Sequence, residues 1–243
     1  MQPINLGAGF KLTDDNKKNG NNTMARLDFL AELHTRTKRN YVQRVIDHDK
    51  AQCADIAKQW GYDYWDGERQ YGYGGYKYDG RWLVLADKLA KQYNLQPGDK
   101  ILDVGCGKGF LMHEFTRAVP GVEVQGLDIS SYAIEHAKEE VKPFLVEGNA
   151  TSLPFPDDHF DLVVSITTLH NLRLPELHQA VKEIQRVGKK HRFISVESYR
   201  NEAEKVNLLY WQLTCESFFT PEEWVWIYQQ CGYEGDWDFI FFE

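Results

Sequence analysis

Three closely spaced glycines follow an apolar segment near the middle of the chain, where residues 101–104 run into Gly105, Gly107 and Gly109. Glycines let the backbone of such a turn approach a ligand closely, and the start of a following helix offers unpaired N–H groups. Asp128 lies about twenty residues further along, where a carboxylate can accept both hydroxyl groups of a ribose. These residues predict a binding site for a nucleoside-containing ligand at a strand-to-helix turn.

The spacing of this loop differs from that of dinucleotide-binding loops, because its third glycine falls at residue 109 and residue 110 is Phe. A pyrophosphate requires the helix dipole and close packing at the third glycine. A cofactor with an amino-acid tail in place of phosphates requires only the open loop. The spacing therefore argues against a nucleotide-dependent oxidoreductase, which stays as one alternative.

Three segments, in order and at matching intervals, resemble the motif series of class I S-adenosylmethionine-dependent methyltransferases. They are Asp103-Val104-Gly105-Cys106-Gly107-Lys108-Gly109, then Leu127-Asp128-Ile129-Ser130, and then residues 153–161. The resemblance covers about residues 98–198 and is to the small-molecule branch of the family. It implies an α/β fold with a doubly wound, Rossmann-like, mostly parallel sheet. It also implies S-adenosyl-L-methionine as methyl donor and S-adenosyl-L-homocysteine as product.

The resemblance further implies which residues hold the donor. In the family, the first acid and the glycine loop contact the methionine part, the second acid holds the ribose, and residues past the third strand flank the adenine. Carried onto this chain, and with a serine of the fourth strand added, the cofactor-binding residues are Asp103, Gly105, Cys106, Gly107, Asp128, Ile129, Asn149, Ala150 and Ser165. Family members often have Asp where Asn149 stands, although an amide can also bond to the base. Arg81 is a further candidate, as a partner of the donor's carboxylate or simply as a surface arginine.

Aromatic residues are concentrated on both sides of the predicted cofactor domain. The chain has 13 Tyr, 13 Phe and 7 Trp, of which nine lie within residues 60–82 and thirteen within residues 199–242. Aromatic faces attract a positively charged sulfur and exclude solvent, so we expect the first group to fold over the site as a lid. The same rings could equally pack the N-terminal helices onto the sheet. The substrate or lid residues predicted from the two groups are Tyr64, Trp65, Tyr73, Tyr76, Tyr78, Tyr199, Tyr210 and Trp211.

Two side chains at the carboxyl edge of the predicted sheet could move a proton. His170 follows the fourth strand and titrates near neutral pH, so it is predicted either as a base or as a hydrogen-bonding residue of the loop. Glu197 ends the fifth strand and is predicted as a base or as a clamp for a cationic or hydroxylated acceptor. Methyl transfer from a sulfonium is an in-line displacement that requires no metal, so positioning alone could also suffice.

Strands and helices alternate after residue 100 and must position these side chains. The predicted strands lie near residues 100–104, 122–127, 143–147, 160–165, 192–197 and 236–242, and the predicted helices near 109–118, 131–141, 175–187, 203–214 and 221–231. The nearly apolar fourth strand is typical of a strand buried on both faces. Alternation of this kind implies a parallel sheet with right-handed crossovers. Family sheets normally end in a hairpin of two strands, but only one final strand is readable here.

Two predicted regions precede the core. Residues 1–23 are polar and rich in Asn, and are predicted to be a mobile N-terminal segment. Residues 24–95 are predicted to form a helical and aromatic lid region. It contains two or three helices before residue 60, a glycine-rich loop without a helix over residues 61–81, and a helix over residues 82–93. Residues 96–243 form the predicted S-adenosylmethionine-binding core.

The charge balance narrows the range of partners. The chain has 28 basic and 36 acidic side chains and a net charge of −8. Residues 1–100 carry 16 basic and 13 acidic side chains, whereas residues 101–243 carry 12 basic and 23 acidic ones. Binding to nucleic acid depends on clustered Lys and Arg, so the acidic half favours a neutral or cationic acceptor over a polyanion. The four cysteines show no metal-binding spacing, and no apolar run approaches eighteen residues. We expect a cytoplasmic protein with no metal, membrane or nucleic-acid partner.

The predicted function is methyl transfer from S-adenosylmethionine to a small polar acceptor, such as a sugar or nucleotide-sugar derivative, an amino acid or an amine. A peptide or protein methyltransferase and a non-catalytic cofactor-binding module are further alternatives. The sequence leaves open which atom of the acceptor is methylated and how many copies of the chain associate.

Overall fold

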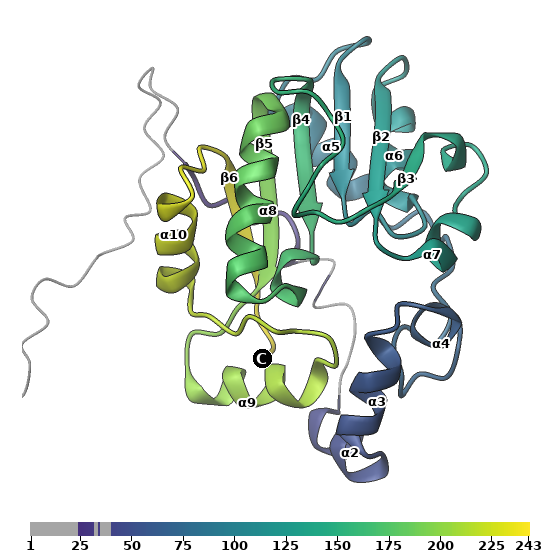
Figure 1. The fold of residues 1–243 in the computed structure, drawn as a ribbon, viewed down its shortest axis with the longest axis vertical. Coiled ribbons are helices and arrows are strands. Elements are labelled where there is room, and N and C mark those ends of the chain that lie inside the picture. Colours follow the sequence, from purple (N-terminus) through teal and green to yellow (C-terminus); the bar gives the residue numbers. More distant parts are fainter. Residues whose placement is uncertain (1–23, 32–33, 35–39) are drawn as a thin grey trace, which may run out of the picture.

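A six-stranded sheet forms the centre of the computed structural model, which describes residues 24–31, 34 and 40–243 (Figure 1). The strands are β1 (Lys100–Val104), β2 (Glu123–Asp128), β3 (Leu145–Glu147), β4 (Phe160–Ile166), β5 (Gly188–Glu197) and β6 (Asp236–Ile240). Their order is β3-β2-β1-β4-β5-β6, and every pair of neighbours is parallel. The strand order reverses between β1 and β4, which confirms the predicted doubly wound, Rossmann-like sheet.

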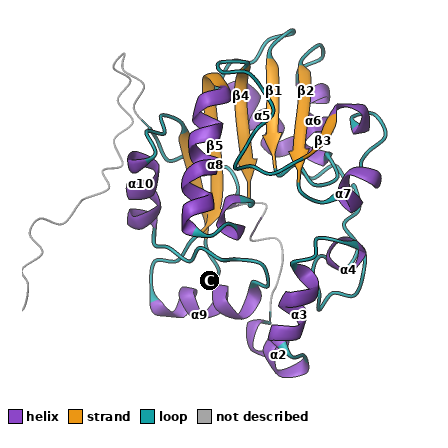
Figure 2. Cartoon of the chain, viewed as in Figure 1, coloured by secondary structure: helices purple, strands orange, loops and turns teal. Residues whose placement is uncertain are grey.

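Helices cover both faces of the sheet (Figure 2). Buried residues of α5 (Leu83–Gln92) and α6 (Phe110–Ala118) belong to one hydrophobic cluster. Those of α8 (Leu174–Val187) and α10 (Pro221–Gln230) belong to the other cluster. Each face therefore has its own core, and together the two cores fix the sheet between the helical layers.

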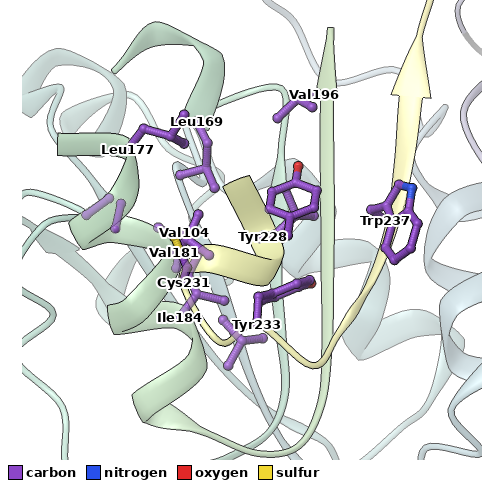
Figure 3. Packing of buried hydrophobic residues seen from close by; sticks show 14 of the residues in the cluster. Val104, Leu169, Leu177, Val181, Ile184, Val196, Tyr228, Cys231, Tyr233 and Trp237 are labelled. Atoms are coloured by element: carbon purple, nitrogen blue, oxygen red, sulfur yellow. The ribbon is translucent and has the colours of Figure 1, made fainter. Parts of the chain in front are cut away.

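Strand β4 shows why the sequence pattern produces this arrangement. Leu162 and Val164 point into the cluster beneath α5 and α6, whereas Val163 points into the cluster beneath α8 and α10. Alternate residues of a strand face opposite sides of a sheet, so a strand covered on both sides is apolar throughout. Figure 3 shows part of the second cluster, to which Val181 of α8 and Tyr228 of α10 both belong.

The free edge of β6 is covered by a segment from near the start of the described chain. The Leu27 N–H donates to the carbonyl of Trp237 at 2.8 Å, and the Trp237 N–H donates to the carbonyl of Ala25 at 3.0 Å. The Asp238 carboxylate accepts from the next backbone N–H groups, including that of Leu30 at 3.0 Å. No described residue forms a second strand beyond β6, so this segment takes the outer position at that edge.

Short helices lie beyond the carboxyl ends of the strands (Figure 1). These are α2 (Tyr41–Asp47), α3 (Lys50–Ala57), α4 (Tyr62–Trp65) and α9 (Glu202–Trp211), and α2 packs against α9. Among the described residues before 60, α2 and α3 agree with the prediction of two or three helices, while the predicted mobile segment 1–23 lies outside the described residues. No helix in the described part of the chain has both the length and the apolar character needed to span a bilayer.

Two sequence predictions of local structure are wrong. The helix expected over residues 131–141 ends early, as α7 (Ser131–Glu135), because the Lys138 N–H donates to the distant carbonyl of Lys108 at 3.0 Å. Turns and the 3₁₀ helix η1 (Lys142–Phe144) follow it. The loop expected over residues 61–81 contains the single helical turn α4 (Tyr62–Trp65), in which the Tyr62 carbonyl accepts from the N–H groups of Asp66 and Gly67.

Candidate active site

A cavity opens at the carboxyl ends of β1, β2 and β4, where the strand order reverses. It is called the glycine-loop cavity below. The predicted cofactor-binding and aromatic residues that line it are Asp103, Gly105, Cys106, Gly107, Asp128, Ile129, Asn149, Ala150, Tyr64, Trp65, Tyr73 and Tyr76. Residues from the sheet and from the N-terminal aromatic segment thus meet around one space, at the position where doubly wound folds bind ligands.

The backbone of the glycine loop requires residues without a side chain. Gly105 has a φ of +83° and Gly107 a φ of +53°, in the left-handed region that favours glycine. A Cβ atom on Gly105 would lie 2.1 Å from the hydroxyl of Thr168, and one on Gly107 would lie 2.8 Å from the ring of Trp65. Both the conformation and the close neighbours therefore account for glycine here.

Two buried carboxylates flank this loop. Asp128 accepts from the N–H of Gly107 at 2.7 Å and from the N–H of Ser130 at 2.8 Å, so it ties the loop to the end of β2. Asp103 is 3% exposed, and no described residue donates a hydrogen bond to its carboxylate. Burial, and secondarily the nearby charge of Asp128, raise the pKa of Asp103 to about 7. A cation bound between these acids would relieve this electrostatic cost.

The remaining predicted cofactor residues divide between the cavity wall and its surroundings. Asn149 lines the cavity, but its side-chain oxygen already accepts from the N–H and hydroxyl of Thr151, at 2.9 and 3.0 Å. Ile129 is apolar and 53% exposed, so it offers a flat open contact. The hydroxyl of Ser165 donates to the carbonyl of Val104 at 2.9 Å, behind the wall and outside the cavity.

Aromatic rings from residues 61–76 cover the glycine loop. The indole N–H of Trp65 donates to the hydroxyl of Ser130 at 2.9 Å, and its ring stacks on Tyr73 at 5.4 Å between centroids. Tyr76 stacks on Phe110, the first residue of α6, at 4.9 Å. These contacts fix the aromatic segment against the end of β2 and the start of α6.

An ion pair reinforces this docking. The Lys108 ammonium donates to both carboxylate oxygens of Asp66, at 2.8 and 2.6 Å, and Tyr132 donates to the same carboxylate at 2.9 Å. Hydrogen bonds from Lys108 and Tyr132 and the Lys108 charge lower the pKa of Asp66, against the effect of burial. Neither partner of the pair stood among the predicted site residues, although Lys108 lies within the glycine motif.

Two further residues of the cavity wall were missed from the sequence. Thr167 has a φ of +51°, unusual for a β-branched residue, at the turn that follows β4. The side-chain oxygen of Asn171 is buried and has no hydrogen-bond partner among the described residues. Both line the glycine-loop cavity. Their loop was visible in the sequence as the segment around His170, but only the fold shows which of its side chains face the cavity.

A second cavity adjoins the first. The two share the walls formed by Tyr64, Tyr73, Trp82 and Thr167. The predicted residues that line only this second cavity are Arg81, His170, Glu197 and Trp211. The structure therefore separates the predicted site residues into two neighbouring spaces with a common boundary.

Glu197 and His170 lie together in the second cavity. The side-chain amide of Gln212 donates to the Glu197 carboxylate, and the His170 Nε2 atom lies 3.6 Å from the same carboxylate oxygen. The backbone N–H of Glu197 points to Nδ1 of His170 at 3.5 Å, which assigns the ring proton to Nε2. Burial lowers the pKa of His170 to about 3, so the ring is neutral.

Several predicted residues lie elsewhere than expected. Arg81 faces the second cavity rather than the first, and its Nε atom donates to Asp79 at 2.7 Å. Tyr78 packs edge-on against Phe110 and lines neither of these two cavities. Tyr210 lines a smaller third cavity. Tyr199 lines none of the three cavities. The ammonium of Lys205 lies 5.1 Å from the centre of the Tyr199 ring.

Comparison with known proteins agrees with this geometry. A family model described as a methyltransferase domain matches residues 101–191. The demethylmenaquinone methyltransferase of Lysinibacillus sphaericus is 39% identical over 104 residues, which are 41% of this chain and 44% of that protein. A sterol 24-C-methyltransferase of Gibberella zeae is 38% identical over 109 residues, which are 42% of this chain and 28% of that protein. The chain thus spans less than half the length of these curated relatives.

Solved structures share the fold. The YcgJ protein of Bacillus subtilis aligns with a TM-score of 0.50 and 24% identity, over 63% of this chain and 68% of that one. A structure titled a putative methyltransferase, from Bacillus halodurans, aligns with a TM-score of 0.52 and 23% identity, over 60% and 68% of the two chains.

Residues 101–191 thus match a methyltransferase domain, and the glycine loop and the sheet around it are similar to those of the class I S-adenosylmethionine-dependent methyltransferases. S-adenosylmethionine is the methyl donor of that class. The names of the two relatives denote different acceptors, so the likeness leaves the acceptor of this chain to be argued from its own site.

Proposed function

We propose that this chain transfers a methyl group from S-adenosylmethionine to a small polar molecule held in the second cavity. The observation that carries the proposal is the boundary that the two cavities share at Tyr64, Tyr73 and Thr167. A donor in one space and an acceptor in the other would meet there. Holding two reactants in line is the main contribution a protein can make to a displacement reaction.

The glycine-loop cavity suits S-adenosylmethionine. Asp103 and Asp128 are buried carboxylates without a cationic partner among the described residues, which fits the ammonium group and the ribose hydroxyls of the donor. The bare backbone at Gly105 and Gly107 leaves room for a ligand against the loop. When bound, the donor supplies an electrophilic methyl group on a positively charged sulfur.

The aromatic segment is proposed as a lid over this cavity. Trp65, Tyr73 and Tyr76 line the cavity and would exclude water from it. Their ring faces also favour a positive charge. Because Lys108 and Asp66 join the segment to the glycine loop, entry of the donor requires this contact to open or the donor to pass beside it.

The second cavity suits a polar acceptor. Its wall includes Glu197, Gln212 and Thr214 beside the aromatic rings, and these polar groups favour an acceptor that can form hydrogen bonds with them. An acceptor oxygen or nitrogen that gains a methyl group releases a proton, and the Glu197 carboxylate is placed to take it. His170 is neutral and lies against Glu197, so we assign it a positioning role with its Nε2–H directed to that carboxylate.

Two measurements test this function. Calorimetric titration of the full chain with S-adenosylmethionine should show binding that Asp128→Asn weakens at least tenfold, while the surface change Glu222→Gln leaves it unaltered. Incubation with labelled donor and a panel of sugars, nucleotide sugars, amino acids, amines, peptides and an apolar quinone, read by mass, identifies the acceptor. Labelling of the quinone or the peptides alone would contradict the proposed small polar acceptor.

A further inference from the structure

We propose that Arg44 and Arg69 form a binding site for an oxyanion, a phosphate or a carboxylate, that the acceptor carries. The inference rests on the proposed function and narrows its acceptor to an acidic small molecule. Both arginines line the second cavity, together with Glu197 and Thr167. A molecule that holds its anion at the arginines can therefore extend through the same space to the boundary with the donor cavity.

The two guanidinium groups converge on one aromatic ring. The central carbon of Arg44 lies 4.7 Å from the ring centre of Trp211, and that of Arg69 lies 5.1 Å from it. Arg44 comes from α2 and Arg69 from the aromatic segment, so elements far apart in sequence bring the two cations together. A flat ring fixes the planes of guanidinium groups and leaves their N–H edges available to a ligand.

Neither guanidinium has a carboxylate partner among the described residues. Arg44 donates through Nη1 to the carbonyl of Arg69 at 3.3 Å, and Arg69 donates through Nη1 to the carbonyl of Gly72. The Nε atom of Arg44 is buried and has no hydrogen-bond partner in the described part of the chain. Burial, together with the charge of Arg69, lowers the pKa of Arg44, as expected for a cation beside a like charge.

Other arginines of the described chain show how such groups are otherwise satisfied. Arg192 donates to the carbonyls of Gln185 and Gly188. Arginines that pair with carboxylates are Arg81, Arg117, Arg173, Arg186 and Arg200. The guanidinium groups of Arg44 and Arg69 instead lie in a cavity, where each can offer N–H donors in the planar fork that binds phosphate and carboxylate.

This site revises the expectation drawn from overall charge. The acidic residues 101–243 favoured a neutral or cationic acceptor, but the arginines that line the second cavity come from the basic first part of the chain. Local charge at the binding surface decides recognition, because charges more than a Debye length away are screened.

The test uses the full chain saturated with S-adenosylhomocysteine, titrated calorimetrically with inorganic phosphate and, separately, with acetate. We expect the wild-type chain to bind at least one anion, and the double change Arg44→Gln with Arg69→Gln to weaken that binding at least tenfold. The exposed Arg173→Gln removes one positive charge elsewhere and should leave anion binding within twofold. Which of the two anions binds more tightly distinguishes a phosphate from a carboxylate on the acceptor.

Controls separate this inference from the proposed function. The double variant should keep its affinity for S-adenosylhomocysteine within twofold, and a paired change to lysine at both positions should recover part of the anion binding. If the wild type binds S-adenosylhomocysteine but neither anion, or if both anions bind equally well to the double variant, the oxyanion site is wrong. If S-adenosylhomocysteine itself does not bind, the proposed function fails first.

Discussion

The ammonium of Lys108 lies 2.6 Å from the carboxylate of Asp66, and this contact joins the glycine loop to the aromatic segment that covers it. The Lys108 side chain is 6% exposed and that of Asp66 is 23% exposed, so the pair is shielded from most solvent. The same Lys108 ammonium donates to the carbonyl of Tyr76 at 3.1 Å. One residue of the glycine loop therefore holds two groups of the covering segment in place.

Removal of this ammonium should loosen the cover. We expect Lys108→Met to lower the free energy of unfolding by about 2 kcal/mol, because it leaves the shielded Asp66 carboxylate without its cation. Amide hydrogen exchange over residues 62–78 should accelerate more than exchange in the sheet. The more exposed pair of Lys142 and Glu139 provides the control, and Lys142→Met should change stability by less than about 1 kcal/mol. Unchanged exchange in residues 62–78 would show that the ion pair does not hold the segment.

The raised pKa of Asp103 predicts how donor binding depends on pH. With a pKa of about 7 in the folded chain, Asp103 is largely protonated at pH 6 and ionised at pH 8. A donor ammonium binds the ionised form of Asp103, so the affinity for S-adenosylmethionine should rise between pH 6 and pH 8. The rise should be at most about tenfold per pH unit, at pH values below the pKa of Asp103. Titrations of wild type and Asp103→Asn at pH 6, 7 and 8 measure this, and the variant should bind more weakly with a flatter profile.

The same shift has the opposite consequence for the stability of the chain without ligand. The folded-state pKa lies above the unfolded value, so the folded chain binds the extra proton between about pH 4 and pH 7. The contribution of Asp103 to stability therefore falls as pH rises through that window. Denaturation of Asp103→Asn should show a smaller fall over this range, and an identical pH dependence in both chains would contradict the assignment.

Substitution of Gly107 should separate crowding from backbone strain. In Gly107→Ala the new Cβ would lie 2.8 Å from the Trp65 ring at a φ of +53°, so we expect a loss of about 2 kcal/mol in stability and at least tenfold weaker donor binding. Gly98 has a φ of +89° but nothing within 4 Å of an added Cβ. Gly98→Ala should cost about 1 kcal/mol and leave donor binding unchanged. Equal effects of the two changes on binding would exclude a role for the Trp65 contact.

Turnover should depend more on Glu197 than on His170 if the carboxylate takes the proton. We expect Glu197→Gln to lower kcat by about a hundredfold or more. We expect His170→Asn to lower it less and to shift the pH profile, because the imidazole acts through Glu197. Steady-state rates from pH 6 to 9 with the identified acceptor provide the measurement, and Glu222→Gln is the surface control. If neither change lowers kcat, catalysis here consists of positioning alone.

Local patterns predicted most of the sheet and many of the residues that line the glycine-loop cavity. The apolar run of β4 and the glycine motif after β1 each depend on residues close together in sequence, so both could be recognised there. The orphaned oxygen of Asn171, the left-handed Thr167 and the pairing of Arg44 with Arg69 depend on which elements meet in space. The early end of α7 has the same origin, because a bond from Lys138 to the distant Lys108 replaces a helical one.

The segment around Leu27 that runs along β6 also bears on the behaviour of the protein at high concentration. An exposed parallel edge presents unpaired N–H and C=O groups that can recruit a strand of another molecule and start aggregation. Backbone bonds from residues 25 and 27 to Trp237 occupy this edge, and at the opposite edge β3 is only three residues long. Trimming the chain to begin after Leu30 would uncover β6, so a shortened version made for crystallisation should precipitate more readily than the full chain.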